Sequence, residues 1–198
     1  MQIPTDREIE TLHRDHAPTR EAFEAVYYHC DLVCQIAEEF FAGLVVYLDT
    51  DLVRAGALLH DVGVYRLYNS AGELDTTDYV RHGVLGHELL QDLGFPEEIC
   101  RFASRHTGVG ITRDDVLRQS LPIPVDDYIP GSPEEELVMY ADKFHSKRTP
   151  PVFVSGDSYA AGVGRWGADK VVAFDALRRR YGEPDLESLS DITGQAVI

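Results

Sequence analysis

Apolar residues recur every three or four positions along most of the chain, which is the spacing of one face of an α-helix. The clearest case runs from about Thr19 to Phe41 and is followed by Gly43, a residue that commonly ends helices. Its apolar positions are Phe23, Val26, Cys30, Val33, Ala37 and Phe40. Strict alternation of apolar and polar residues is never sustained long enough to build a sheet. The pattern therefore predicts an all-α protein.

Capping and breaking residues divide the rest of the sequence into further helices. Thr5 and Glu8 have the spacing of a capping box, and Asp49 or Thr50 can cap a helix that ends just before Gly63. Further helices are expected over about 78–93, from Pro96, from Thr112, from Ser132, and over 168–181 and about 185–193. We expect irregular structure at 65–77, 120–130 and 149–166, although "PPVFVS" has the composition of an extended stretch.

The charge of the chain limits its partners. The 198 residues carry 34 Asp and Glu against 18 Lys and Arg, a net charge of −16, so neither nucleic acid nor an anionic membrane surface is an expected partner. A small phosphorylated substrate stays compatible with this charge, because bound divalent cations reverse the local field. Three cysteines without a CxxC pattern, no leader-like start and no apolar stretch of ~18 residues together predict a cytoplasmic protein.

Six polar residues fall at inward positions of the predicted helices. His60 and Asp61 end the apolar run in "GALLHDVGVY", where two neighbouring side chains can reach one ion that lies off the helix axis. Asp142 shares a helix face with Val138, and an unpaired buried carboxylate there would cost several kcal/mol. The other three are His29, His82 and His106.

Each of these residues alone has an ordinary structural interpretation, as a hydrogen-bonded core histidine or as part of a solvated helix end. Four histidines and two aspartates on inward faces of five helices are better explained together by one shared ligand. Imidazole and carboxylate groups in combination suit Mn, Fe, Co, Ni or Zn. The sequence therefore predicts a divalent transition-metal site.

The order His29, His60-Asp61, Asp142 resembles the HD domain superfamily of metal-dependent phosphohydrolases, and the addition of His82 and His106 resembles its six-ligand, two-metal branches. Segments such as "LLHDVG", "HGVLGHELLQDLGFPEEI" and "EELVMYADK" are similar to small archaeal and bacterial HD hydrolases over nearly the whole chain. "RHTG" and the spacing from Asp142 to Arg148 also resemble the HD branch that hydrolyses diadenosine tetraphosphate. The resemblance implies a single helical bundle over 1–198, with a core at about 19–148 and a packed C-terminal extension at 149–198.

The resemblance also implies a role for each of these side chains. One ion would be held by His29, His60, Asp61 and Asp142, and a second by His82, His106 and the other oxygen of Asp61. Asp61 would bridge the two ions and take part in catalysis. Two cations that share a water present hydroxide to phosphorus, which implies hydrolysis of a phosphoester or phosphoanhydride, most readily in a nucleotide.

The sequence departs from the family at one position, and the departure leaves alternatives open. Many members carry a lysine where this chain has Val64, so Arg148, Arg66 and Arg105 become candidates to bind phosphate in its place. For Arg66 and Arg105, a solvated surface position is an equal expectation. A di-iron enzyme that uses O₂, or a non-catalytic nucleotide-binding regulatory domain, would fit the same ligand set. The identity of the metal and the oligomeric state, a homo-oligomer included, stay open.

Four other residues carry weaker expectations. His13 lies on a polar first helix and is expected to be exposed, whereas the lone Trp166 is expected to anchor the last helices. His87 and His145 lie on ligand-bearing helices but have no place in the motif, so we expect them behind the ligands or on the surface. His145 is also a candidate to contact substrate.

Overall fold

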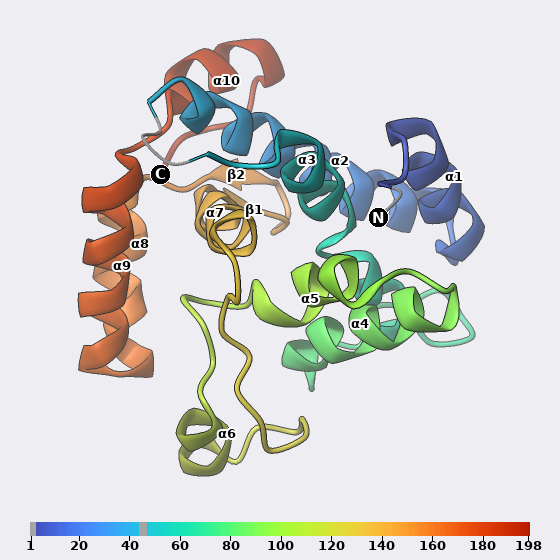
Figure 1. Ribbon diagram of the computed structural model, residues 1–198. Helices are drawn as coiled ribbons and strands as arrows, with labels where there is room; N and C mark the ends of the chain where they lie inside the picture. Colours follow the sequence, from blue (N-terminus) through green and yellow to red (C-terminus); the bar gives the residue numbers. More distant parts are fainter. Residues whose placement is uncertain (1–2, 44–46) are drawn as a thin grey trace.

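The computed structural model describes residues 3–43 and 47–198, and this part of the chain is almost entirely helical (Figure 1). The predicted all-α class is confirmed, with one small addition, a two-stranded antiparallel sheet of β1 (His145–Ser146) and β2 (Val152–Phe153). The α-helices are α1 (Asp6–His16), α2 (Arg20–Glu39), α3 (Thr50–Leu59), α4 (His82–Asp92), α5 (Glu97–Arg105), α6 (Arg113–Gln119), α7 (Pro133–Ala141), α8 (Gly156–Val163), α9 (Ala168–Tyr181) and α10 (Leu186–Thr193). Short 3₁₀ helices cover Phe40–Gly43, Val62–Leu67, Tyr79–Arg81, Asp142–Phe144 and Gly164–Trp166.

Side-chain caps set most of the helix starts where the sequence predicts them. Thr5 and Glu8 form the expected capping box, and Thr19, Asp49 and Ser132 each accept a hydrogen bond from a first-turn backbone N–H. The prediction of irregular structure over 149–166 is wrong in its second half, because Ser155 caps α8 there.

The predicted end of α3 at Gly63 is also wrong. The helix ends at Leu59, and Gly63 instead lies inside the following 3₁₀ helix. A Cβ on Gly63 would lie 2.1 Å from the carbonyl oxygen of His82 and 2.2 Å from the amide nitrogen of Gly86. Gly63 therefore permits a close approach of the chain after Asp61 to the backbone of α4.

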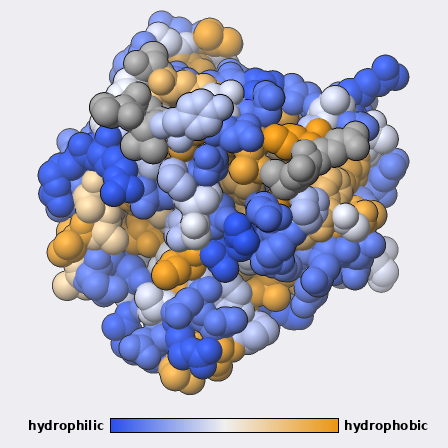
Figure 2. All heavy atoms as spheres, in the orientation of Figure 1, coloured by the Kyte–Doolittle hydropathy of each residue, from blue (hydrophilic) through white to orange (hydrophobic). Residues whose placement is uncertain are grey.

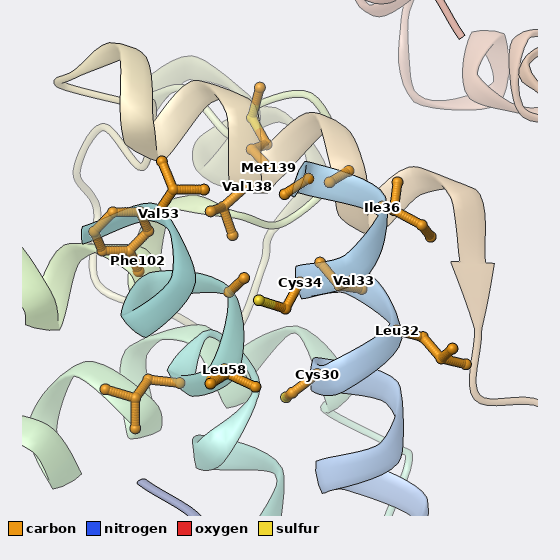
Figure 3. Packing of buried hydrophobic residues seen from close by; sticks show 14 of the residues in the cluster. Cys30, Leu32, Val33, Cys34, Ile36, Val53, Leu58, Phe102, Val138 and Met139 are labelled. Atoms are coloured by element: carbon orange, nitrogen blue, oxygen red, sulfur yellow. The ribbon is translucent and has the colours of Figure 1, made fainter. Parts of the chain in front are cut away.

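The hydrophobic core lies where α2, α3, α5 and α7 meet (Figure 3). Cys30 and Cys34 of α2 point toward Leu58 of α3, and all three cysteines of the chain are buried free thiols. Val138 of α7 and Phe102 of α5 are at most 2% exposed, and each such side chain contributes about 1.5–3 kcal/mol through its burial. These helices are therefore firmly packed, and three of them, α3, α5 and α7, carry polar residues of the candidate site at their ends.

The C-terminal helices pack on α7 through aromatic rings. The hydroxyl of Tyr140 donates to the carbonyl oxygen of Gly182 at 2.6 Å, and its ring stacks on Tyr181 at 5.5 Å. The end of the chain then runs beside β2, where the amide of Phe153 donates to the carbonyl oxygen of Ala196 at 2.9 Å. In Figure 1 the pair α8 and α9 lies on the opposite side of the molecule from α4 and α5.

One face of the molecule is mainly polar. Figure 2 shows a face on which hydrophilic residues predominate and apolar residues occur in small, scattered groups. Among the described residues, no helix combines the length and the apolar character that a membrane span requires.

Candidate metal centre

The six predicted ligands come from separate elements and converge on one buried cluster. His29 lies within α2, whereas His60, His82, His106 and both aspartates stand at or beside helix ends. The four histidines and Asp61 are at most 5% exposed, and the side chain of Asp142 is 15% exposed. The helix ends matter because a side chain there can turn off the helix axis toward a point shared with its neighbours.

Asp61 joins two groups of nitrogen atoms. Its Oδ2 lies 3.4 Å from Nε2 of His29. That nitrogen also lies 3.0 Å from Oδ1 of Asp142 and 3.2 Å from Nε2 of His60. Its Oδ1 lies 3.4 Å from Nε2 of His82 and 3.5 Å from Nε2 of His106. One oxygen of the same carboxylate thus faces each group, which is the geometry that a bridging ligand requires.

Backbone carbonyls fix the tautomer of three histidines. Nδ1 of His60 donates to Ala57 at 2.7 Å, Nδ1 of His82 to Tyr79 at 2.6 Å and Nδ1 of His106 to Phe102 at 3.1 Å. In a neutral imidazole the proton is then on Nδ1, and the Nε2 that faces the cluster carries a bare lone pair.

The cluster fits a cation. Asp61 Oδ1 is buried and has no hydrogen-bond partner among the described residues, and an orphaned buried oxygen is costly. The Nε2 atoms of His82 and His106 lie 2.9 Å apart, so two bare lone pairs face each other beside that oxygen. Two groups of side chains could each hold an ion, His29 with His60 and Asp142, and His60 with Asp61 and His106. This nitrogen and oxygen donor set suits Mn, Fe, Co, Ni or Zn.

Burial and neighbouring charges together set the protonation states of the cluster. Burial alone would raise the pKa of Asp61, but the Lys147 ammonium and His60 hold that pKa well below its ordinary value. Burial opposes ionisation of Asp142 in the same way, and the neighbouring Lys143 keeps its pKa well below the ordinary value. Burial and Lys147 lower the pKa of His29 to about 3. The carboxylates are therefore ionised and His29 is neutral near pH 7. Although burial opposes its charge, Cys30 and Asp61 hold the pKa of His60 well above its ordinary value, so metal binding at His60 would release a proton.

Two lysines at the centre were not predicted from the sequence. Lys143 donates to Asp142 Oδ2 at 2.6 Å and to the carbonyl oxygen of His106 at 3.0 Å, and Lys147 contacts Asp61 Oδ2. A signal for them exists in the composition, because the chain has only three lysines among its 18 basic residues. The third, Lys170, contacts Asp115, and both residues line the cavity described in the next paragraph. Each lysine thus pairs with an aspartate at or near the site.

A cavity of about 460 Å³ opens from the cluster, a size suited to one small molecule. Asp61, His82, His106, Asp142 and Lys147 form its polar floor. It lies between the α4–α5 side and the α8–α9 side of the molecule (Figure 1). Its apolar and aromatic wall includes Tyr79, Val109, Ile111, Leu121, Tyr159, Val163 and Trp166.

The structure does not bring the three candidate arginines into this cavity. Arg66 pairs with Asp92 at 2.8 Å on the surface, Arg105 lies 3.7 Å from Glu135, and Arg148 is exposed. None of the three is among the residues that line the cavity. Lys147, by contrast, contacts Asp61 and lines the cavity.

The expectations for His13 and Trp166 are wrong. His13 is fully buried, and both of its ring nitrogens have partners. Nε2 donates to the carbonyl oxygen of Leu58 and Nδ1 contacts the Tyr65 hydroxyl, both at 2.8 Å. Trp166 is half exposed and lines the cavity, so it does not serve as a buried anchor.

The two remaining histidines differ in their surroundings. His87 is partly buried, with Nδ1 3.0 Å from Oγ of Ser104 and Nε2 3.3 Å from Glu97. His145 is buried directly behind His29, with 2.7 Å between their Nδ1 atoms.

Comparison with known proteins agrees with this geometry. The model of the family described as "HD domain" matches residues 26–147, a span that includes all six residues of the cluster. The chain belongs to the HD domain family. An uncharacterized protein of Methanocaldococcus jannaschii is 37% identical to this HD protein over 130 residues, which cover 63% of this chain and 70% of the relative.

Other relatives are longer enzymes or share only the fold. A tRNA (cytidine(56)-2'-O)-methyltransferase of Picrophilus torridus is 39% identical over 98 residues, half of this chain but only 25% of that enzyme. The HD domain of the L. monocytogenes phosphodiesterase PgpH, solved in complex with cyclic-di-AMP, superposes with a TM-score of 0.53. The match covers 95% of this chain and 98% of that domain at 15% identity, so it shows a shared fold.

Proposed function

We propose that this HD protein hydrolyses a phosphoester or phosphoanhydride bond in a small phosphorylated molecule, most readily a nucleotide. The observation that carries the proposal is the environment of Asp61. Its two oxygens face two different groups of histidine nitrogens, Oδ1 lacks a hydrogen-bond partner, and the carboxylate forms part of the floor of a ligand-sized cavity.

The six side chains would hold two divalent transition ions, with Asp61 as the ligand that they share. Such ions supply Lewis acidity, which lowers the pKa of a bound water and neutralises charge on phosphoryl oxygens. His29, His60 and Asp142 would hold the first ion together with one oxygen of Asp61. His82 and His106 would hold the second with the other oxygen.

Lys147 would bind the phosphate of the substrate. Its side chain is 21% exposed and lies where the cluster meets the cavity, so an ammonium on a flexible stem can turn from Asp61 to an incoming phosphate oxygen. This would supply the cation that is absent at Val64, which is itself buried in the core. In the proposal, Lys147 replaces the three arginines that lie outside the cavity.

The cavity also supports a nucleotide as substrate. Its walls offer aromatic and aliphatic surface to a base, and Lys147 together with the two ions would offer positive charge to a phosphate. The PgpH domain, which shares the fold, binds the nucleotide cyclic-di-AMP. The relatives found give no support to the diadenosine tetraphosphate branch, so a substrate of that kind is only one member of the panel to be tested.

The test is a metal-resolved activity screen. The purified protein is stripped of metal, reloaded separately with Mn, Fe, Co, Ni or Zn, and assayed against nucleoside phosphates, cyclic dinucleotides and dinucleoside polyphosphates. We expect phosphate-ester or anhydride cleavage with at least one metal and its loss in Asp61→Asn. A folded, metal-loaded protein inert toward the whole panel would contradict the proposal.

The same preparations separate the two alternatives. Oxygen consumption by the iron-loaded protein without phosphate-bond cleavage would support a di-iron enzyme. Nucleotide binding without turnover, unaffected by Asp61→Asn, would support a regulatory domain.

A further inference from the structure

His29 differs from the other three histidines of the cluster in what fixes its proton. His60, His82 and His106 each donate from Nδ1 to a backbone carbonyl three or four residues earlier. Nδ1 of His29 instead faces another imidazole nitrogen, Nδ1 of His145, at 2.7 Å. The two rings stack with their centres 5.0 Å apart. The tautomer of His29 therefore depends on that of His145.

The two imidazoles share one proton along this contact. A neutral imidazole carries a single proton, on one of its two nitrogens. If His29 keeps Nε2 bare for a metal, its proton must be on Nδ1 and must be donated to His145. Nδ1 of His145 is then bare, and the proton of that ring is on Nε2.

A hydrogen-bond acceptor lies next to Nε2 of His145, the nitrogen that then carries the proton. Nε2 of His145 lies 2.9 Å from Oε1 of Gln195, a residue that is 9% exposed. A carbonyl oxygen can only accept, so it selects the tautomer with hydrogen on Nε2 of His145. The opposite orientation of the amide would donate to His145 and place a proton on Nε2 of His29, where the lone pair is needed.

Gln195 comes from outside the segment that matches the HD family, which ends at residue 147. The backbone around it is held in place on both sides. The hydroxyl of Ser190 donates to the carbonyl oxygen of Gln195 at 2.6 Å, and the amide of Ser155 donates to that of Ile198 at 2.8 Å. The C-terminal residues thus bring a polar side chain to the back of the metal cluster.

We propose that Gln195 is a positioning residue for the metal centre, which acts through His145 to keep Nε2 of His29 free to bind the first ion. The inference rests on the metal cluster of the proposed function and is independent of the reaction catalysed there. Outer hydrogen-bond partners of metal-binding histidines commonly affect metal affinity by 10–100-fold. Their loss need not affect the second site, which His82 and His106 form.

The experiment combines a substitution, a rescue and a matched control. Gln195→Leu removes the acceptor. His145→Asn supplies a carbonyl oxygen that accepts from Nδ1 of His29 without help from Gln195. Val197→Ala removes packing from the same tail and leaves the relay intact. Affinity for Mn²⁺ or Zn²⁺ at each site is measured by competition with a chromophoric chelator, and ¹⁵N NMR of labelled histidines in the metal-free protein reports which ring nitrogens carry protons.

We expect bare Nε2 on His29 in the wild-type protein and a mixture of tautomers in Gln195→Leu. First-site affinity should fall by about 10–100-fold in Gln195→Leu. The same substitution should have little effect in the His145→Asn background, because that background no longer uses the glutamine. Val197→Ala should lower Tm without changing affinity.

Three results would overturn the inference. They are a proton on Nε2 of His29 in the metal-free wild-type protein, unchanged first-site affinity in Gln195→Leu, and equal losses from Gln195→Leu in both backgrounds. The NMR measurement needs neither metal nor substrate. A failure of the proposed hydrolysis would therefore leave this inference intact, and the reverse also holds.

Discussion

The ammonium of Lys147 contacts Oδ2 of Asp61, although 86 residues separate them in the sequence. The same oxygen lies 3.4 Å from Nε2 of His29, so the lysine and this histidine contact the same carboxylate oxygen. Asp61 and Tyr79 raise the pKa of Lys147 above its ordinary value despite burial, which opposes its charge, so it stays cationic. Arg148, the next residue, is exposed and is not among the residues that line the cavity.

This difference predicts unequal effects of two neighbouring substitutions. Lys147→Met should lower kcat/KM for the nucleotide identified in the screen by about 100-fold, because one charge-assisted donor to the phosphate is lost. Arg148→Met, the matched control, should change it less than about threefold. Steady-state kinetics with equal metal loading checks both. Equal losses in the two variants would remove Lys147 from the proposed phosphate site.

Metal should also stabilise the fold, because a cation satisfies the orphaned Asp61 Oδ1 and the bare nitrogens around it. At an ion concentration 100 times the dissociation constant, binding adds about 2.7 kcal/mol, or roughly 5–10 °C in Tm for a chain of this length. Differential scanning calorimetry with Mn²⁺ or Zn²⁺ and after chelation measures the difference. Asp61→Asn should lose most of it. An Asp61→Asn protein that gains as much stability as the wild type would contradict a shared carboxylate ligand.

The close approach at Gly63 predicts a pronounced effect of a single methyl group. Gly63→Ala would place Cβ against the backbone of His82 and Gly86, so we expect destabilisation of about 3 kcal/mol or more. The displacement of α4 should also weaken metal binding at His82. Gly162→Ala is the control, because nothing lies within 4 Å of a Cβ there and alanine favours the helix. Urea unfolding compares the two, and a similar stability for both variants would argue against the tight packing after Asp61.

The sequence predicted the fold well where local signals decide the structure. Caps at Thr5, Thr19 and Asp49 and the spacing around Cys30 are local features, and the helices begin and pack accordingly. The six positions of the cluster could be named because histidines and aspartates on apolar faces are unusual in a helical pattern and because their order resembles the HD family; their role as ligands stays a prediction. The division into a core at about 19–148 and an extension stays a prediction.

The errors concern side chains whose partners are distant in sequence. His13 looks exposed on a polar helix, but Leu58 and Tyr65 supply its hydrogen bonds. Lys147 directly precedes Arg148, the arginine that the sequence favours, and only the fold shows that the lysine is the one that contacts Asp61. Gln195 carried no signal at all, because its role depends on how the chain end runs along β2.

The burial of His13 predicts how stability depends on pH. Burial lowers the pKa of His13 to about 4, compared with an ordinary value of 6.5 in an unfolded chain. Between these values the unfolded state binds a proton that the folded state does not, so the free energy of unfolding must fall as pH decreases from about 6.5 to 4. The shift corresponds to about 3 kcal/mol across this window. Above pH 6.5 this histidine adds no pH dependence, because it is neutral in both states.

His13→Gln tests this prediction, because glutamine can still donate to the carbonyl oxygen of Leu58 but does not titrate. The variant is expected to be less stable at pH 7, since the contact with the Tyr65 hydroxyl changes, but its stability should fall less steeply below pH 6.5. Urea unfolding of the metal-free protein across the window gives the two slopes, and their difference isolates His13 from the other buried histidines. Tyr65→Phe provides a second test. It removes the hydroxyl that donates to the neutral ring, so it should raise the pKa of His13 and narrow the window. Parallel curves for the wild type and His13→Gln would show that this imidazole does not titrate differently in the folded and unfolded states.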